Sequence, residues 1–254
     1  KADIQSALKL GIKAIHLPPE EVKEYEQPQK DIYHQISVGV SRYVRGLGEE
    51  SAACETGCSL AGPLLYPYVR WMLNESAKRG INRLYFVARD GWILKRIADR
   101  IIRSEMPGIQ THYIYGSRKV WRLPAYEGSV EDFDRLLKWS NLDEVLCVRD
   151  LAEVFQLSVE ELCSFLPKGY GKNIGEQQLS VFQRDNICRQ LREDEAFRNY
   201  IIESQMEKRK LVIRYLQQEI DFSDDRYAFV ELSGTGLTQK CLAQIIKNFY
   251  TGEI

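Results

Sequence analysis

The run AFVELSGTGLTQKCLAQII, residues 228–246, constrains the fold more than any other part of this sequence. Its opening residues are apolar up to Val230, which is typical of a buried parallel strand. A turn rich in Gly, Ser and Thr follows at 233–236 and leads into an amphipathic helix. Because the first N–H groups of a helix lack intrahelical partners and face such a turn, this order of elements forms an anion site. We therefore predict a phosphate site here, with Glu231 beside it to accept hydrogen bonds from sugar hydroxyls.

Two further strand and turn units come earlier in the chain. RLYFVA at 83–88 predicts a strand that is followed by a polar turn and an amphipathic helix, and THYIYGS at 111–117 predicts the next strand. Strands that alternate with helices indicate an α/β fold with a parallel, Rossmann-like sheet. From about 130 to 220 the pattern is helical almost throughout. We therefore predict a large helical insertion, after which the chain returns to the sheet at Tyr227.

Composition and charge narrow the function classes. The chain has 254 residues, of which 44% are hydrophobic and 28% charged, and this is enough for one substantial core. Its 35 basic and 36 acidic side chains nearly cancel, so no global charge favours nucleic acid or an anionic membrane. No apolar run approaches the roughly 20 residues of a membrane span, and the first residues lack the pattern of a signal peptide. We expect a cytoplasmic protein with no transmembrane segment.

The six cysteines form neither a metal site nor a disulfide pattern. Cys54 and Cys58 are a C-x3-C pair without a second pair or a nearby histidine, whereas a structural zinc ion takes four ligands. The other four cysteines stand singly in apolar patterns, which is typical of buried thiols. We expect no metal ion bound by protein side chains alone.

The N-terminal residues have the pattern of the tail of a separate domain. A helix is predicted over 3–10, and a short strand is predicted over 13–17, before two prolines. The charged segment 20–31 then indicates a linker or a surface helix. We place a domain boundary after residue 26, so that an α/β domain occupies 27–254.

Three predicted strands end in polar loops, and ligands of open parallel sheets bind at the carboxyl ends of the strands. Cationic side chains in these loops suit a phosphate or diphosphate, with arginine able to make bidentate contacts. Asp90 and Glu231 are the acidic candidates for a proton acceptor, for binding hydroxyls, or for a position near Mg²⁺. The full candidate set is Arg89, Asp90, Gly91, Ser117, Arg118, Lys119, Glu231, Ser233, Gly234, Thr235, Gly236, Thr238 and Gln239.

Each loop taken alone has a simpler explanation. Arg89 and Asp90 would form a surface ion pair, and Ser117 with Arg118 would cap the segment that follows. Three such loops at one edge of a sheet favour a ligand site. The two interpretations therefore differ in whether the three loops form one ligand site or have separate structural roles.

Aromatic residues add a weaker indication of a sugar ligand. Trp92 and Trp121 each follow closely on a candidate loop, so either could form a wall against an acceptor sugar. Tyr66, Tyr68 and Trp71 recur at helical spacing, and we expect them to be core residues.

Two of these segments resemble type I phosphoribosyltransferases. FVELSGTGLTQ is similar to the loop that holds the ribose hydroxyls and terminal phosphate of phosphoribosyl diphosphate, and LYFVARDGWILKRIAD is similar to the strand, loop and helix that contact the diphosphate. That family usually has two adjacent acidic residues in the first loop, whereas this sequence has Glu231 alone. The resemblance implies a sheet of the phosphoribosyltransferase type, with Mg²⁺ bound through the diphosphate of the donor.

A more specific resemblance links GPLLYPYVRWM, LYFVARDG, YIYGSR and the late strand to a region of bacterial surface-polysaccharide biosynthesis proteins. There the region follows a phosphatase domain of the haloacid-dehalogenase type, and DIQSALKLGIKAIHLP is similar to the end of such a domain, with Asp3 in its last acidic motif. The resemblance implies a glycan phosphoribosyltransferase. It would transfer phosphoribose to a sugar hydroxyl of a glycan acceptor, with release of pyrophosphate, and the partner phosphatase domain would then remove the phosphate.

Two other function classes stay open. A phosphohydrolase of the haloacid-dehalogenase type is suggested by the N-terminal tail, but Ala88 stands where the nucleophilic aspartate of that family would be. The other is a noncatalytic module that binds a phosphosugar within a polysaccharide synthase, and it predicts binding without turnover. Within the transferase hypothesis, we expect Asp90 to be the base, assisted by Arg89 and Arg118, with Glu231 as the alternative base.

Overall fold

The chain consists of two compact units, Lys1–Glu75 and Ser76–Ile254. We describe a computed structural model, which covers residues 2–14, 23, 26, 31–48, 51–138, 140, 142–167, 174–176, 178–232 and 234–251. The boundary expected after residue 26 falls beside residues 24–25 and 27–30, which lie outside the described ones, so it stays a prediction. No helix among the described residues has both the length and the apolar character needed to cross a membrane.

The secondary-structure elements among the described residues of the first unit are all helices. Its elements are α1 (Ala2–Lys9), α2 (Ile32–Leu47), α3 (Ala52–Thr56), the π-helix η2 (Gly57–Ala61) and α4 (Gly62–Lys78), which ends in the second unit. Asp31 caps α2, since its carboxylate accepts hydrogen bonds from the N–H groups of Tyr33 and His34. Arg45 of α2 binds Glu26 (2.7 Å) and the hydroxyl of Ser59 (2.8 Å).

Two predictions for this unit need correction. Lys13 and Ala14 are not in a strand, and the rest of the strand expected over 13–17 lies outside the described residues. Tyr66 and Trp71 are not core residues, because 46% and 59% of their surface is exposed. Val69 and Leu73 of α4 are fully buried instead. Tyr66 and Trp71 are therefore surface residues of α4.

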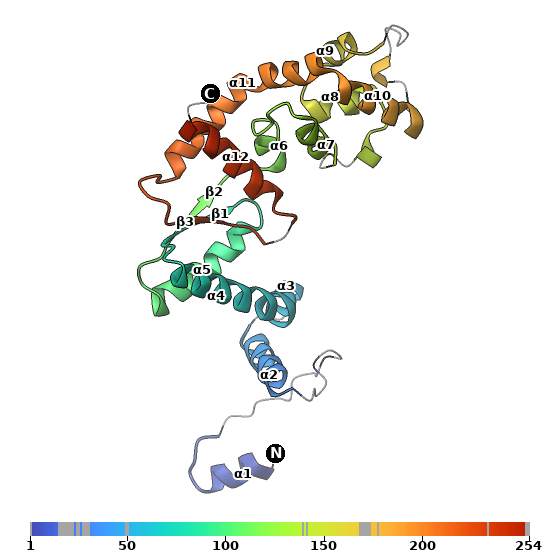
Figure 1. Ribbon diagram of the computed structural model, residues 1–254. Coiled ribbons are helices and arrows are strands. Elements are labelled where there is room, and N and C mark those ends of the chain that lie inside the picture. Colours follow the sequence, from blue (N-terminus) through green and yellow to red (C-terminus); the bar gives the residue numbers. More distant parts are fainter. Residues whose placement is uncertain are drawn as a thin grey trace. The chain divides into compact units, whose positions relative to one another are not determined.

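The second unit contains the parallel sheet that the sequence predicts. Its strands are β1 (Arg83–Val87), β2 (Gln110–Ile114) and β3 (Tyr227–Val230), in the order β2-β1-β3, and both pairings are parallel. The α/β class is therefore confirmed. The helices α5 (Gly91–Glu105), α6 (Arg118–Trp121) and α12 (Leu237–Thr251) follow the three strands, and Figure 1 shows α5 and α12 on opposite sides of the sheet.

The alternation of side chains along β1 explains this layering. Tyr85 and Val87 belong to a buried cluster with Leu242 and Ile245 of α12 and with residues of α11. Phe86 points to the other face, where Gly91 at the start of α5 lies against it. Because successive side chains of a strand point to opposite faces, a strand covered on both faces is mainly apolar, as residues 84–87 of β1 are. All five residues of β1 are buried accordingly.

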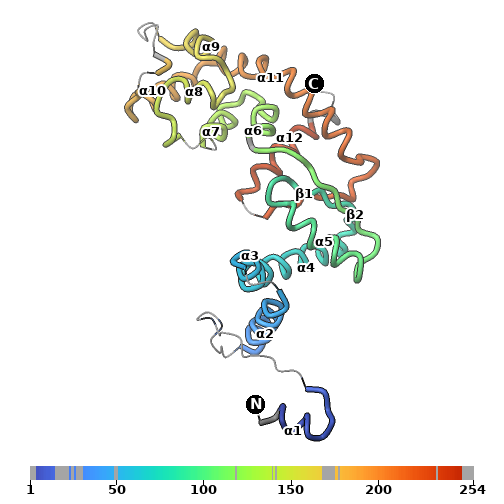
Figure 2. The backbone as a smooth tube through the Cα atoms, turned by 180° about the vertical axis from the view of Figure 1, so that it is seen from behind, coloured from blue at the N-terminus to red at the C-terminus, as the bar shows by residue number. Residues whose placement is uncertain are grey.

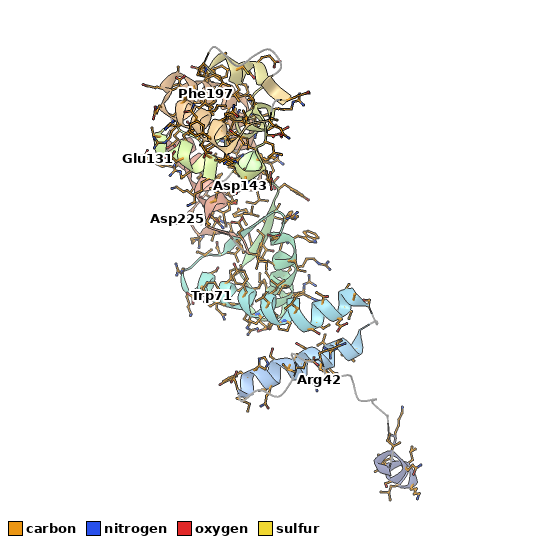
Figure 3. All side chains as sticks on the ribbon, turned by 90° about the vertical axis from the view of Figure 1, so that its right-hand side faces the viewer. Arg42, Trp71, Glu131, Asp143, Phe197 and Asp225 are labelled. Atoms are coloured by element: carbon orange, nitrogen blue, oxygen red, sulfur yellow. The ribbon has the colours of Figure 1, made fainter. Side chains whose placement is uncertain are left out.

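Between β2 and β3 the chain forms the helical block that the sequence predicts. It contains α7 (Val130–Lys138), η3 (Leu142–Glu144), α8 (Val148–Phe155), α9 (Val159–Ser164), η4 (Ile174–Glu176), α10 (Val181–Glu193) and α11 (Glu195–Glu219). The tube in Figure 2 runs through this block and returns along α11 to the sheet. The block has its own core, in which Phe133, Phe155 and Phe197 pack together with ring centroids 5.1–6.2 Å apart. Figure 3 labels Phe197 among these side chains.

Arg83 connects the start of β1 with the loop before β3. It is 7% exposed, and its guanidinium donates to Asp221 (2.7 Å), to Ser223 (3.2 Å) and to the carbonyl of Asp224 (3.1 Å), besides pairing with the Asp224 carboxylate. We predict that Arg83→Met lowers the melting temperature by several degrees, because methionine fills the space but leaves these acceptors without their donor. Thermal unfolding followed by circular dichroism measures the effect.

The same contacts predict how the stability depends on pH. Hydrogen bonds from Ser223 lower the pKa of Asp221, and those from Arg226 lower the pKa of Asp224, with Arg83 adding to both shifts. A carboxyl group with a lowered folded-state pKa stabilises the fold fully above its unfolded pKa of about 3.9, and that stabilisation is lost as the pH falls through the folded value. Wild type should therefore lose stability below about pH 4, and Arg83→Met should lose less over the same range. Equal acid dependence of the two proteins would contradict this account of Arg83.

Candidate functional site

The three parallel strands end side by side at one edge of the sheet. Val87 is in register with Ile114, and Phe86 is in register with Val230, so the carboxyl ends of β1, β2 and β3 align. The loops that begin at residues 88, 115 and 231 therefore leave the sheet from the same edge. This arrangement brings together the starts of the three loops that carry the candidate residues.

The loop after β1 presents Arg89 and Asp90 to solvent. It leaves the sheet at Ala88, whose N–H donates to the carbonyl of Ile114 (2.9 Å), and the peptide bond between Ala88 and Arg89 is cis. The side chain of Arg89 is 97% exposed and that of Asp90 is 50% exposed, with Nε and Oδ1 3.9 Å apart. An exposed ion pair with its charged atoms this far apart contributes little to the stability of the fold. The side chain of Asp90 makes no capping hydrogen bond to α5 either, so both groups are accessible to a ligand.

Gly91 fixes how this loop meets the sheet. A Cβ atom at this position would lie 2.9 Å from the carbonyl carbon of Phe86, closer than real Cβ contacts allow. Only glycine lets α5 begin this near to β1. The close approach holds the backbone of Asp90 at the edge of the sheet.

The loop after β2 is held in place by Trp121. A Cβ atom at Gly116 would overlap the indole ring of Trp121, so the ring packs directly against the loop backbone. The carbonyl of Ser117 accepts hydrogen bonds from Val120 (2.9 Å) and Trp121 (3.1 Å), which start α6. Ser117 and Lys119 are exposed, whereas the side chain of Arg118 lies outside the described residues. The prediction that Trp121 forms a wall for a sugar is wrong, because the indole is 1% exposed and supports the loop from inside.

The loop after β3 has the geometry expected of the glycine-rich turn. Gly234 and Gly236 have φ values of +125° and +75°, a region that favours glycine, and both are exposed together with Thr235. A Cβ atom at either glycine would meet open space, so the backbone faces solvent there. Ser233 lies outside the described residues. The turn leads directly into α12, whose first N–H groups have no intrahelical acceptors.

Glu231 and Thr238 connect the two ends of this turn. The hydroxyl of the buried Thr238 donates to Oε1 of the half-buried Glu231 (3.0 Å). The next residue, Gln239, is half-buried, and its Oε1 has no hydrogen-bond partner among the described residues. The contact holds one carboxylate oxygen of Glu231 toward the first turn of α12. The carboxylate and the N–H groups of the helix start therefore lie in the same neighbourhood.

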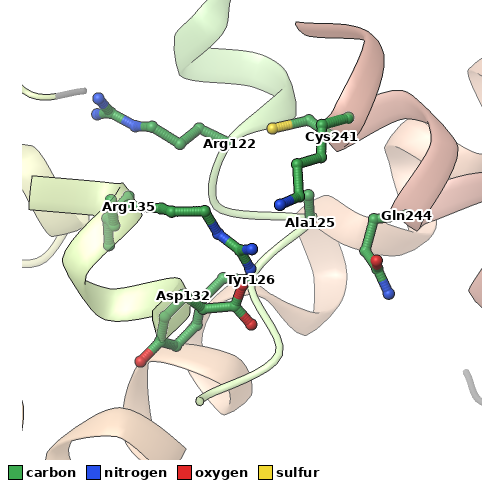
Figure 4. Close-up of a pocket in the computed structure, with 9 residues that line it drawn as sticks. Arg122, Ala125, Tyr126, Asp132, Arg135, Cys241 and Gln244 are labelled. Atoms are coloured by element: carbon green, nitrogen blue, oxygen red, sulfur yellow. Dashed lines mark ion pairs between the residues drawn. The ribbon is translucent and has the colours of Figure 1, made fainter. Parts of the chain in front are cut away.

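A pocket that the sequence does not reveal lies beside the second turn of α12 (Figure 4). It is lined by Arg122, Ala125, Tyr126, Asp132, Arg135, Leu136, Lys240, Cys241 and Gln244. Asp132 and Arg135 form an ion pair on α7, and burial raises the pKa of the Cys241 thiol to about 11 in spite of the nearby cations. The only signal of this pocket in the sequence is the spacing of Asp132 and Arg135. The residues on its two sides, 122–136 and 240–244, are more than a hundred positions apart in the chain, so a local sequence pattern does not predict that they meet.

No model of a known protein family matches this chain, and no curated protein is significantly similar to it.

Proposed function

We propose that this chain is a glycan phosphoribosyltransferase, which transfers phosphoribose from phosphoribosyl diphosphate to a sugar hydroxyl and releases pyrophosphate. The observation that carries the proposal is the alignment of three parallel strand ends, each followed by a loop with a different part of the required chemistry. A glycine turn at a helix start suits the phosphate, exposed cations suit the diphosphate, and an accessible carboxylate suits the acceptor hydroxyl.

The loop after β3 would bind the phosphoribosyl half of the donor. The terminal phosphate would accept hydrogen bonds from the backbone of 234–236 and from the first turn of α12, in the direction that the helix dipole favours. Glu231 would accept hydrogen bonds from the ribose hydroxyls. Its contact with Thr238 orients the carboxylate before any ligand arrives.

The diphosphate would lie toward the loops after β1 and β2. Arg89 and Lys119 are exposed there, and Arg118 adds a third cation by its place in the sequence. Mg²⁺ would come with the diphosphate and neutralise part of its charge, and such an ion needs only one or two protein carboxylates. Asp90 and Glu231 are the carboxylates that the loop positions offer.

In the reaction, the oxygen of an acceptor hydroxyl bonds to the anomeric carbon of the ribose while the bond from that carbon to the diphosphate oxygen breaks. Pyrophosphate leaves with the electron pair, and the cations of the two loops stabilise its charge. Asp90 takes the proton of the acceptor hydroxyl. A single displacement of this kind inverts the configuration at the anomeric carbon.

Isothermal titration calorimetry with phosphoribosyl diphosphate and Mg²⁺ tests the donor site. We expect one binding site per chain, with ribose 5-phosphate and pyrophosphate each binding more weakly than the intact donor. If wild type binds none of the three, both the transferase and a noncatalytic phosphosugar-binding module are excluded. Binding of the donor without any turnover would leave the binding module as the better description.

The proposal extends to the partners and the location of the reaction. A phosphatase domain of the haloacid-dehalogenase type would remove the phosphate from the transferred phosphoribose and leave ribofuranose on the glycan. The acceptor is a bacterial surface polysaccharide or its precursor, and we place the reaction in the cytoplasm. These three points rest on the resemblance described above.

A further inference from the structure

Three aromatic side chains form a row next to the loop that carries Asp90. The rings of Trp92 and Tyr113 meet edge to face with centroids 5.5 Å apart, and those of Tyr113 and Tyr115 meet in the same way at 5.1 Å. Trp92 is 55% exposed and Tyr115 is 69% exposed, whereas Tyr113 between them is half-buried. The two outer rings therefore present apolar surface to solvent in one continuous group.

The backbone fixes the position of each ring in this row. Trp92 is in the first turn of α5, two residues after Asp90, and its N–H donates to the carbonyl of Arg89 (3.2 Å). Tyr113 lies within β2, opposite Phe86 of β1. Tyr115 is the first residue after β2, and its N–H donates to the hydroxyl of Tyr215 (2.7 Å). Tyr113 and Tyr115 thus lie along β2 and at its carboxyl end, where the loops leave the sheet.

The row begins beside Asp90, because Trp92 follows Asp90 by two residues and lies in the first turn of α5. Burial raises the pKa of Tyr113, and the charges of Tyr115 and Asp90 raise it further. The ring of Tyr113 meets that of Trp92 with centroids 5.5 Å apart, so a ligand on the row lies next to the turn that carries Asp90.

The form of this surface suits a sugar ring. One face of a pyranose carries C–H groups that pack on an aromatic ring, while its rim carries hydroxyls that donate to a carboxylate. A nucleobase would be better held between two parallel rings, and the rings of this row meet nearly perpendicular to each other, at 76° and 87°.

We propose that Trp92, Tyr113 and Tyr115 form the subsite that binds the acceptor sugar and directs one of its hydroxyls to Asp90. The acceptor role rests on the proposed function, because it takes Asp90 as the base of that reaction. The sugar-binding property of the row stands on its own geometry.

Saturation-transfer difference NMR with methyl glucopyranoside, methyl galactopyranoside and methyl mannopyranoside tests the row in the absence of donor. We expect saturation of the ring C–H protons of at least one glycoside, and a three- to tenfold weaker affinity, about the worth of an aromatic contact, in Trp92→Ala and Tyr115→Ala. Phe182→Ala is the matched control, because Phe182 is 78% exposed on α10, outside the row, and its removal should leave binding unchanged.

Several outcomes would overturn this inference. No glycoside binding by wild type would do so, as would equal binding by wild type and both row variants, or binding of adenosine in place of the glycosides. Calorimetry with phosphoribosyl diphosphate on the same variants separates this inference from the proposed function. Sugar binding that needs Trp92 in a chain that does not bind the donor would keep the sugar site and refute the transferase. Unchanged melting temperatures would show that the variants are folded, as expected for two exposed side chains.

Discussion

Asp90→Asn should lower the rate of pyrophosphate release by about 100- to 10,000-fold, the usual contribution of a general base. Asparagine keeps the shape of the side chain but cannot accept the proton of the acceptor hydroxyl. Asp90 is suited to this role because its carboxylate is half exposed, makes no capping hydrogen bond to α5 and, among the described residues, pairs with Arg89 at a distance of 3.9 Å. Steady-state kinetics with a coupled pyrophosphate assay measure the loss.

The same variant should still bind phosphoribosyl diphosphate, because we place the phosphoribosyl half of the donor on the loop after β3 and its diphosphate on the cations of the other two loops. Asp143→Asn is the matched control, since its side chain is 97% exposed and it lies in the helical block, where Figure 3 labels it. If Asp90→Asn keeps its activity while Glu231→Gln loses it, Glu231 is the base. If both variants keep full activity, the catalytic use of this edge of the sheet is refuted.

Gly236→Val should weaken the binding of phosphoribosyl diphosphate by about 100-fold or more. A φ of +75° strains any residue with a Cβ atom, and a β-branched side chain would also enter the open space where we place the phosphate. The loss of two hydrogen bonds to a charged phosphate accounts for a change of about this size. Calorimetry with the donor and Mg²⁺ gives the ratio of the two dissociation constants.

Gly80 provides a matched control for this substitution. It has nearly the same φ, +72°, and a Cβ atom there would also meet open space, but it lies in the turn between α4 and β1, at the amino end of the sheet. Gly80→Val should therefore cost similar stability and leave donor affinity unchanged. Equal weakening by both substitutions would mean that general destabilisation explains the effect. Unchanged affinity in Gly236→Val would exclude the turn as the phosphate site.

The sequence predicts the sheet and its edge well because the signals there are local. The strands β1 and β3 are short, mainly apolar runs, each turn contains glycine, and the helices after β1 and β3 are amphipathic, so the pattern of one segment determines its own structure. The parallel order then follows from the alternation of strands and helices. The observed strands differ from the expected ones only at their ends, where the boundaries of an apolar run and of a hydrogen-bonded ladder need not coincide.

Local sequence patterns are least successful in predicting whether an aromatic side chain is buried or exposed. Trp121 is buried because Gly116 leaves room for its ring, and Trp71 is exposed although it recurs at helical spacing with buried neighbours. A ring is apolar enough to be buried and polar enough at its edge to be exposed, so the neighbours decide. Those neighbours come from elsewhere in the chain. The aromatic row shows the same limit, since only the strand pairing and the start of α5 bring Tyr113 to Trp92.

The measurement that tests the central claim most directly is a pyrophosphate-release assay with phosphoribosyl diphosphate, Mg²⁺ and a panel of acceptor sugars, with the products identified by mass spectrometry. The account predicts one pyrophosphate released for each phosphoribosylated sugar formed, only when an acceptor is present, and with loss of both products in Asp90→Asn. Release of inorganic phosphate from phosphosugars, abolished by Asp90→Asn, would contradict the account and support a phosphohydrolase.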